Sequence, residues 1–235
     1  MFLQPLVDSR TRKVVSAEAL ARIRDEEGEL LSPAVFIPIA EHNGQINRLG
    51  EQVLEKTCRF IQEEDMERLG LSWINVNLSP IQCMRRNLSQ ELAQILQRYQ
   101  VEADRVHLEI TEESMIDLSQ LQRQIQALQE EGFQFALDDY GSGYSNLVNV
   151  KRVFFVNIKL DMELVRDYFA HRDALLPAVV QAFKAMDYSI TAEGIESAEM
   201  ADALTEIGCD YLQGYYFSRP LPMKEFVGKY GVPQE

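Results

Sequence analysis

The stretch Phe133-Gln-Phe-Ala-Leu-Asp-Asp-Tyr-Gly-Ser-Gly-Tyr144 runs a short apolar segment into two adjacent aspartates and then into a loop that contains two glycines. Residues 133–138 have the apolar composition and the length of a buried strand. Neighbouring side chains of a strand point to opposite faces, so Asp138 and Asp139 share one volume only where the strand ends and the chain turns. Two carboxylates at such short range repel each other unless a positive charge lies between them. The stretch therefore predicts a strand whose C-terminal end carries a charged site.

The same succession of a short strand and a helix recurs along the whole chain. The segment 31–44, for example, offers Ser32 as an N-cap, Pro33 at the first helical position and Asn43-Gly44 as a stop. Further helical patterns are expected at 49–70, 117–132, 173–187 and 197–208. Strands are expected near 2–7, 14–20, 72–77, 105–110, 133–138, 154–160, 188–193 and 209–214.

Eight strands that alternate with helices predict an α/β fold. In a chain of 235 residues this number of units favours a closed (β/α)8 barrel of the TIM type over an open sheet. The gap between the first two strands, about residues 8–13, is too short for a helical crossover, so these two strands should pair antiparallel. We therefore expect an irregular TIM-type (β/α)8 barrel with an antiparallel strand near the N-terminus.

Composition narrows the class of protein. An apolar content of 46% and a charged content of 26% are ordinary for a soluble globular protein. No apolar run approaches the length of a membrane span and no signal peptide is present, so we expect a cytoplasmic domain without membrane contact. The cysteines, Cys58, Cys83 and Cys209, are odd in number and form no CxxC motif, which favours reduced thiols that serve in packing. The net charge of −14 argues against binding to long nucleic acid, but it admits a small anionic ligand if metal ions intervene.

In barrels of this kind the chemistry collects at the C-terminal ends of the strands. Nearly every predicted strand from the second onward ends there in a carboxylate, an amide or an ammonium. Carboxylate and amide oxygens suit Mg²⁺ or Mn²⁺, and no pair of histidines has the spacing of a zinc site. The residues at these ends are Glu18, Asn77, Glu109, Glu112, Asp138, Asp139, Lys159, Asp161, Glu193, Glu196 and Gln213.

A ring of carboxylates around two metal ions is typical of phosphoester hydrolysis, in which the ions lower the pKa of a water and stabilise the attacking and leaving oxygens. Asp138 is the natural bridging ligand, and the two adjacent aspartates then each hold a metal. Lys159 on the next strand can orient the attacking water or offset the charge that develops on the phosphate.

An ordered series of motifs along nearly the whole chain resembles the EAL family of cyclic di-GMP phosphodiesterases. The family's three-letter signature is Glu18-Ala19-Leu20. A few positions depart from the family pattern, such as Ile23 where tryptophan is usual, and none of these departures removes a metal ligand. The other matching segments are Gln4–Val7, Arg22, Ser32-Pro33, Phe36–Pro38, Val76–Ser79 with Gln82, Leu108–Glu112, Leu137–Ser145, Lys159–Asp161, Ala192–Glu196 and Gln213–Tyr215.

The resemblance implies an irregular TIM barrel whose second strand runs antiparallel. It also implies hydrolysis of one phosphodiester of cyclic di-GMP, a bacterial second messenger, to linear pGpG with two Mg²⁺ or Mn²⁺ ions. By resemblance, Glu18, Asn77, Glu109 and Asp138 hold one metal, and Asp138, Asp139 and Glu193 hold the other.

The resemblance assigns further roles around these ligands. Lys159 positions the nucleophilic water, and Gln213 lies near the substrate and its water network. Glu112 is not itself a ligand and holds in place the loop that contains Tyr140, Gly141, Ser142 and Gly143. Glu196 supports the site or a dimer. Substrate contacts fall to Gln4, Leu20, Arg22, Pro33, Asp161 and Gln213, with Arg22 at a phosphate and Gln4 and the region from Leu20 to Pro33 near a guanine.

Two other interpretations remain open at this point. A silent domain of the same family would bind cyclic di-GMP as a receptor, although such members usually lose a metal carboxylate or the loop and this chain keeps them. A metal-dependent enzyme with another substrate, or a scaffold with an idle site, is the third interpretation. We further expect residues 1–235 to be a single domain excised from a longer protein with sensor or GGDEF domains, and to form a homodimer.

Overall fold

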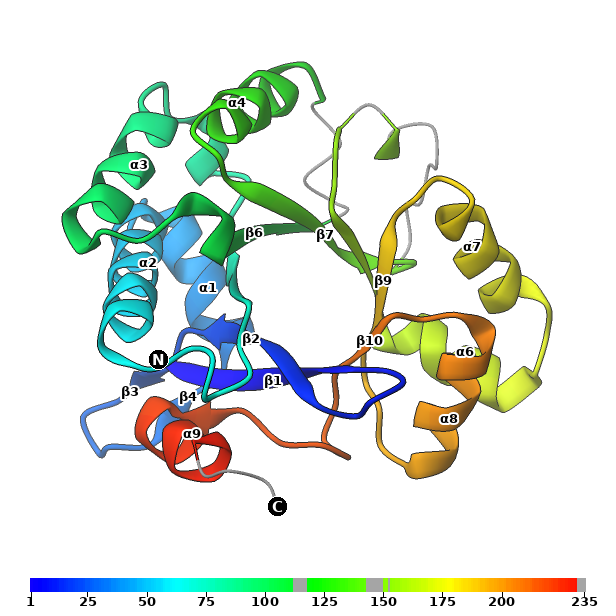
Figure 1. The fold of residues 1–235 in the computed structure, drawn as a ribbon. Helices are drawn as coiled ribbons and strands as arrows, with labels where there is room; N and C mark the ends of the chain where they lie inside the picture. Colours follow the sequence, from blue (N-terminus) through cyan, green and yellow to red (C-terminus); the bar gives the residue numbers. More distant parts are fainter. Residues whose placement is uncertain (112–117, 143–149, 152, 232–235) are drawn as a thin grey trace.

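The computed structural model describes residues 1–111, 118–142, 150–151 and 153–231, with the backbone alone described for residues 118–120. In Figure 1 a ring of strands lies inside a surrounding layer of helices. The strands of the ring follow the order β10-β9-β8-β7-β6-β5-β2-β1, and the pairing of Val7 with Leu212 closes β1 onto β10. The predicted (β/α)8 barrel is therefore confirmed. Its strands are β1 (Phe2–Asp8), β2 (Val14–Leu20), β5 (Trp73–Asn77), β6 (Val106–Thr111), β7 (Gln134–Tyr140), β8 (Asn157–Leu160), β9 (Ser189–Ala192) and β10 (Tyr211–Leu212).

One strand of the barrel runs against the others, and it is the first. β1 is antiparallel to both β2 and β10, whereas β2 is parallel to β5. The prediction of an antiparallel strand near the N-terminus is confirmed, but the detail that this is the second strand is wrong. The reversal happens in the tight turn after β1, where Asp8 Oδ1 accepts hydrogen bonds from the amides of Arg10 and Thr11. As a result, the first residues of β1 lie at the barrel end where the other strands finish, and Gln4 stands opposite Glu18.

Three two-residue strands were not predicted from the sequence. β3 (Ile23–Arg24) and β4 (Leu30–Leu31) form a small antiparallel hairpin between β2 and the first helix. β11 (Leu221–Pro222) pairs with the start of β1. Two residues are too few to show the alternation that identifies a strand in a sequence.

The helices cover the outside of the barrel (Figure 1). α1 starts at Pro33 with Ser32 in the N-cap position, as predicted, although the Ser32 side chain makes no capping hydrogen bond. The helix predicted at 49–70 is shorter, because the chain leaves α2 at Glu64 and residues 65–70 form turns in which Asp65 Oδ1 accepts the amide of Arg68. The helices are α1 (Pro33–His42), α2 (Ile46–Glu63), α3 (Leu88–Tyr99), α4 (Leu118–Glu130), α6 (Met162–His171), α7 (Leu175–Lys184), α8 (Ala198–Ile207) and α9 (Met223–Tyr230), with 3-10 turns at Gln82–Met84 and Ala103–Arg105.

Alternation along the strands separates an apolar layer from a polar one. On β8, for example, Ile158 and Leu160 belong to the hydrophobic core, whereas Asn157 and Lys159, which alternate with them, are buried polar residues. Because successive side chains of a strand point to opposite faces, the first pair packs under the helices and the second points into the barrel. The three cysteines are unpaired and buried, and burial raises the pKa of each thiol to about 12, as expected of packing residues. Among the described residues, no helix combines the length and the apolar composition needed to cross a membrane.

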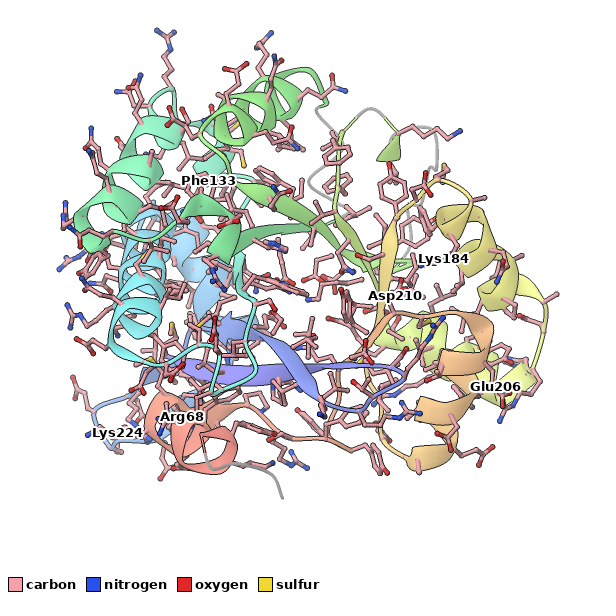
Figure 2. All side chains as sticks on the ribbon, in the orientation of Figure 1. Arg68, Phe133, Lys184, Glu206, Asp210 and Lys224 are labelled. Carbon is pink, nitrogen blue, oxygen red and sulfur yellow. The ribbon has the colours of Figure 1, made fainter. Side chains whose placement is uncertain are left out.

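An ion pair ties the second half of the barrel together. Both carboxylate oxygens of Asp210, which precedes β10, lie 2.8 Å from Lys184 Nζ at the end of α7. Figure 2 shows the two labelled side chains pointing toward each other. Asp210 Oδ2 also accepts a hydrogen bond from the amide of Ile190 at 2.8 Å. One carboxylate therefore joins a helix to two neighbouring strands.

We expect Asp210→Ala to lower the free energy of unfolding by about 2 kcal/mol, because it removes charged hydrogen bonds to both a side chain and a strand amide. The matched control is Asp202→Ala. Among the described residues Asp202 pairs with Arg12 alone, and its side chain is 73% exposed, so the expected loss is about 0.5 kcal/mol or less. Urea unfolding of the three proteins measures both values, and equal losses would contradict the role given to Asp210.

Candidate active site

The C-terminal end of the barrel gathers carboxylates around one ammonium. Lys159, on β8, is 1% exposed and points into the barrel. Its Nζ lies 2.8 Å from Glu193 Oε1, 2.9 Å from Glu109 Oε1, 2.9 Å from Asp138 Oδ1 and 3.5 Å from Glu18 Oε2. The side chains that the sequence placed at separate strand ends therefore meet at one point. Lys159 lies at the centre of this group of side chains.

A bulge in β7 brings the adjacent aspartates to the same side. Leu137 pairs with Ile158 and Tyr140 with Leu160, so three steps on β7 match two steps on β8. The bulge therefore includes Asp139, whose φ of +55° lies in the left-handed region. Asp139 also donates its amide to Asp138 Oδ1 at 3.0 Å. The sequence predicted that the strand ends at the aspartates, but the strand continues to Tyr140 and the bulge breaks the alternation instead.

Two amides hold the carboxylate of Glu18. Asn77 Nδ2 donates to Glu18 Oε1 at 2.7 Å, and Gln213 Nε2 donates to Glu18 Oε2 at 2.8 Å. The three residues come from β5, β2 and the end of β10. The structure thus brings Asn77 and Gln213 to the carboxylate cluster as predicted, with both amides bonded to Glu18.

Burial dominates the electrostatics of the cluster, and the attraction of Lys159 for most of its carboxylates opposes it. Burial raises the pKa of Glu109 and Asp138, and it raises the pKa of Glu193 to about 8. Burial, followed by the neighbouring charge of Asp138, raises the pKa of Asp139 to about 6. The pKa of Glu18 is lowered although burial opposes this, because Lys159 and the two amides favour its charged form.

The pKa of Lys159 itself is raised despite its burial, because the surrounding carboxylates stabilise the ammonium. The protein's own cation is therefore fully charged and cannot by itself hold all of its neighbours ionised.

The donor set fits two hard divalent cations. Oxygens of Glu18, Glu109 and Asp138 lie within 4.8 Å of one another, and so do oxygens of Asp138, Asp139 and Glu193. Asp138 belongs to both groups, as expected of a bridging ligand. Among the described residues Glu109 Oε2 is buried without a hydrogen-bond partner, as an oxygen reserved for an ion would be. Five carboxylates and one ammonium leave four negative charges, which two divalent cations would balance.

Three cavities open around this cluster. The largest has a volume of about 600 Å³ and combines Glu18, Asn77 and Glu109 with apolar residues of α1 and α2. Leu20, Arg22 and Pro33, three of the predicted substrate contacts, also line it. A second cavity of about 310 Å³ lies on the other side of Glu18 and contains Gln4, Glu193, Glu196 and Gln213. A third of about 290 Å³ contains Asp139, Ser142 and Asp161.

Two predicted residues at the cavity walls are already engaged. Asp161 is the N-cap of α6, and its Oδ1 accepts the amide of Glu163 at 2.8 Å. Glu196 accepts a hydrogen bond from Arg166 Nη2 at 2.6 Å in an exposed ion pair. Both residues nevertheless line cavities that carboxylates of the cluster also line.

The predicted loop after the aspartates is described only in part. Tyr140 is buried, and its ring packs edge-on against Phe183 at a centroid distance of 4.8 Å, so it belongs to the core and not to a cavity. Gly141 has a φ of +103°, and a Cβ there would lie 2.7 Å from Leu164 Cδ2. The amide of Ser142 donates to the carbonyl of Asp139 at 3.2 Å. Glu112 and Gly143 lie outside the described residues.

Several residues at the site were not predicted from the sequence. Asn75 donates to Glu109 Oε1 at 2.7 Å, and its position two residues before Asn77 on the same strand face was a usable signal. Arg166 and Tyr215 line the second cavity from loops and helices whose approach to the barrel the sequence does not reveal.

The raised pKa values predict that metal binding depends on pH. Because the folded-state pKa of Glu193 is about 8 and that of Asp139 about 6, both above their ordinary values, protonation stabilises the metal-free fold at low pH. This contribution is lost as the pH rises through those values, and a metal ion needs the ionised groups. We therefore expect Mg²⁺ to raise the melting temperature more at about pH 8.5 than at about pH 5.5.

Thermal unfolding at both pH values, with and without Mg²⁺, measures this difference. Glu193→Gln removes a carboxyl group that titrates between these two pH values, so it should flatten the dependence. An equal Mg²⁺ effect at both pH values in the native protein would contradict the electrostatic account.

Comparison with known proteins gives a consistent picture. The chain matches the family described as EAL domain over residues 1–220. The cyclic di-GMP phosphodiesterase PdeF of Escherichia coli (strain K12) is 30% identical over 226 residues, which cover 95% of this chain and 30% of PdeF. The solved structure of PaMucR phosphodiesterase in its c-di-GMP complex is 31% identical with a TM-score of 0.87, and the match covers 95% of this chain and 92% of that chain. The manganese/cy-diGMP complex of Klebsiella pneumoniae BlrP1 is 28% identical with a TM-score of 0.80, over 94% of this chain and 55% of that chain.

The chain spans about 30% of the length of the curated relatives that it matches. Within that length, the family match includes every strand of the barrel and every carboxylate of the cluster. The chain therefore belongs to the EAL domain family.

Proposed function

We propose that the chain hydrolyses one phosphodiester bond of cyclic di-GMP to give linear pGpG, with two bound Mg²⁺ or Mn²⁺ ions. The observation that carries the proposal is the pair of oxygen groups that share Asp138, in a member of a family whose relatives include named cyclic di-GMP phosphodiesterases. Cavities on both sides of Glu18 open onto the cluster. A dinucleotide has two lobes, and in these cavities it can place a phosphate at the carboxylates.

The ligand roles follow the two oxygen groups. Glu18, Asn77, Glu109 and Asp138 would hold one ion, and Asp138, Asp139 and Glu193 the other. Bound there, the ions supply Lewis acidity at the scissile phosphate and a water of lowered pKa. For Asn77 this role requires its amide oxygen to face the ion, in place of the amide nitrogen that now donates to Glu18.

The position of Lys159 among the carboxylates suits it to contact a water or the phosphate. An ammonium carries three donors, and four carboxylates lie within 3.5 Å of Nζ. A carboxylate that takes another partner releases one of these donors, which can then orient a water or offset negative charge on the phosphate. Gln213, bonded to Glu18 beside this point, extends the same polar edge toward the second cavity.

The largest of the three cavities around the cluster has the features of a nucleobase site. Its walls include Leu20, Pro33, Ile37 and Leu49, and its volume of about 600 Å³ lies in the range typical of small-molecule pockets. Arg22 is a basic side chain at this cavity, and in a chain of net charge −14 it is the fitting partner for a phosphate. Gln4 stands on the opposite side of Glu18, in the second cavity.

The wider setting is also part of the proposal. We infer that residues 1–235 form one domain of a longer cytoplasmic protein with sensor or GGDEF domains, since the curated relatives are about three times as long as the match. A homodimer is proposed as the assembly, and long nucleic acid is not a partner of a domain with this charge.

Asp138→Asn and Glu18→Gln should each lower pGpG formation by more than about 100-fold, because each removes a carboxylate from the metal site. The assay incubates the protein with cyclic di-GMP and Mn²⁺ and separates the products by chromatography, with a chelator to stop the reaction. Asp202→Asn, on an exposed helix face, is the matched control and should keep the native rate.

Either site variant at the native rate would overturn the assigned roles. The alternative function, a silent receptor, predicts tight binding of cyclic di-GMP with no pGpG from the native protein. The complete set of five carboxylates favours the enzyme over this receptor.

A further inference from the structure

A chain of hydrogen bonds runs from the interior of the barrel to the carboxylate cluster. Trp73 Nε1 donates to Asn75 Oδ1 at 2.7 Å, and Asn75 Nδ2 donates to Glu109 Oε1 at 2.7 Å. Trp73 and Asn75 lie two residues apart on β5, so both side chains point into the barrel. Asn75 is 2% exposed and Glu109 is 1% exposed, so water does not compete for these bonds.

The chemistry of the two partners fixes the orientation of the Asn75 amide. An indole N–H can only donate, and a carboxylate oxygen accepts. The amide oxygen must therefore face Trp73 and the amide nitrogen must face Glu109. A flipped amide would lose both bonds and would place its oxygen against a carboxylate oxygen.

The ring of Trp73 is itself held in place. It stacks on His107 at a centroid distance of 4.9 Å and meets Tyr211 edge-on at 5.5 Å. The donor that orients Asn75 thus belongs to a packed aromatic group drawn from three strands.

The hydrogen bond from Asn75 makes the two oxygens of Glu109 different from each other. Oε1 accepts from Asn75 at 2.7 Å and lies 2.9 Å from Lys159 Nζ, so its two lone pairs are engaged. Oε2 is buried and has no hydrogen-bond partner among the described residues. A carboxylate anchored through one oxygen in this way presents the other oxygen in a fixed direction.

We propose that Asn75, oriented by Trp73, is a positioning residue that aims Glu109 Oε2 at a bound metal ion. The inference rests on the metal-dependent function proposed above and adds two residues to it, neither of which is a ligand. Its physical basis is that partners of a metal ligand set the ligand's orientation, and their loss commonly weakens metal binding by about 10- to 100-fold.

The first test measures Mn²⁺ affinity by titration calorimetry on the whole chain. Asn75→Ala should weaken binding by about 10- to 100-fold. Asn157→Ala is the matched control, because Asn157 is also a buried amide inside the barrel but bonds to Ser189 and Thr191. It should change the affinity by less than about twofold.

Trp73→Phe provides a second variant that keeps an aromatic ring in the packed group while removing the indole donor. It should weaken Mn²⁺ binding in the same direction as Asn75→Ala, and by a smaller factor. Should Asn75→Ala fail to fold, Trp73→Phe with unchanged Mn²⁺ affinity would overturn the positioning role.

The second test uses the fact that Trp73 is the single tryptophan of the chain. The protein therefore gives one indole N–H signal in a ¹⁵N–¹H spectrum. Saturating Mg²⁺ should shift this signal in the native protein and in Asn157→Ala, because the ion polarises Glu109 and through it Asn75. In Asn75→Ala the shift should disappear.

The outcomes separate this inference from the proposed function. If the native chain bound neither Mn²⁺ nor Mg²⁺, both proposals would fall. If the native chain bound Mn²⁺ and Asn75→Ala bound it equally well, or if Asn157→Ala weakened binding as much as Asn75→Ala, only the positioning role would be overturned. An indole signal unmoved by Mg²⁺ in a native protein that binds the ion would overturn it as well.

Discussion

The crowding of five carboxylates around one ammonium is the constraint on which the rest of this structure depends. Lys159 contacts four of them, yet it carries one charge, and the raised pKa values of Glu109, Asp138, Asp139 and Glu193 show that these groups favour a proton when no further cation is present. Groups with pKa values shifted in this way cluster at functional sites, where a ligand can relieve the repulsion. The donor set of the cluster thus fits cations, and Lys159 supplies one fixed positive charge of its own.

The regular barrel brings the strand ends together, and two backbone irregularities complete the site. The reversal of β1 carries Gln4 to the functional end, and the bulge in β7 turns Asp138 and Asp139 to one side. The left-handed φ of Asp139 is an unfavourable conformation for a residue with a side chain, and such conformations persist where surrounding structure enforces them. The anchoring of Glu109 by Asn75 belongs to the same pattern, since it limits the freedom of a ligand before the ion arrives.

Much of the barrel and of the carboxylate cluster was predictable from the sequence, because strand ends are marked by a change from apolar to polar residues. That signal alone was sufficient to locate Glu18, Glu109, Asp138, Lys159 and Glu193. It could not reveal the direction of β1, since a short link shows only that two strands are antiparallel and not which of them opposes the sheet. The family resemblance assigned Tyr140 to a functional loop, whereas its ring packs in the core beside Phe183. The sequence does show that Asn75 shares a strand face with Asn77, but its partner Glu109 lies on another strand, so the hydrogen bond between them is visible only in the structure.

The most direct test of the central claim is a crystal of the native chain soaked in Mn²⁺, with anomalous scattering recorded at the manganese edge. The account predicts two peaks per chain, one beside Glu18, Glu109 and Asp138 and one beside Asp138, Asp139 and Glu193. The absence of both peaks at a saturating concentration, with Lys159 Nζ still among the carboxylates, would mean that protons and one lysine suffice to stabilise the cluster, and the account would be wrong.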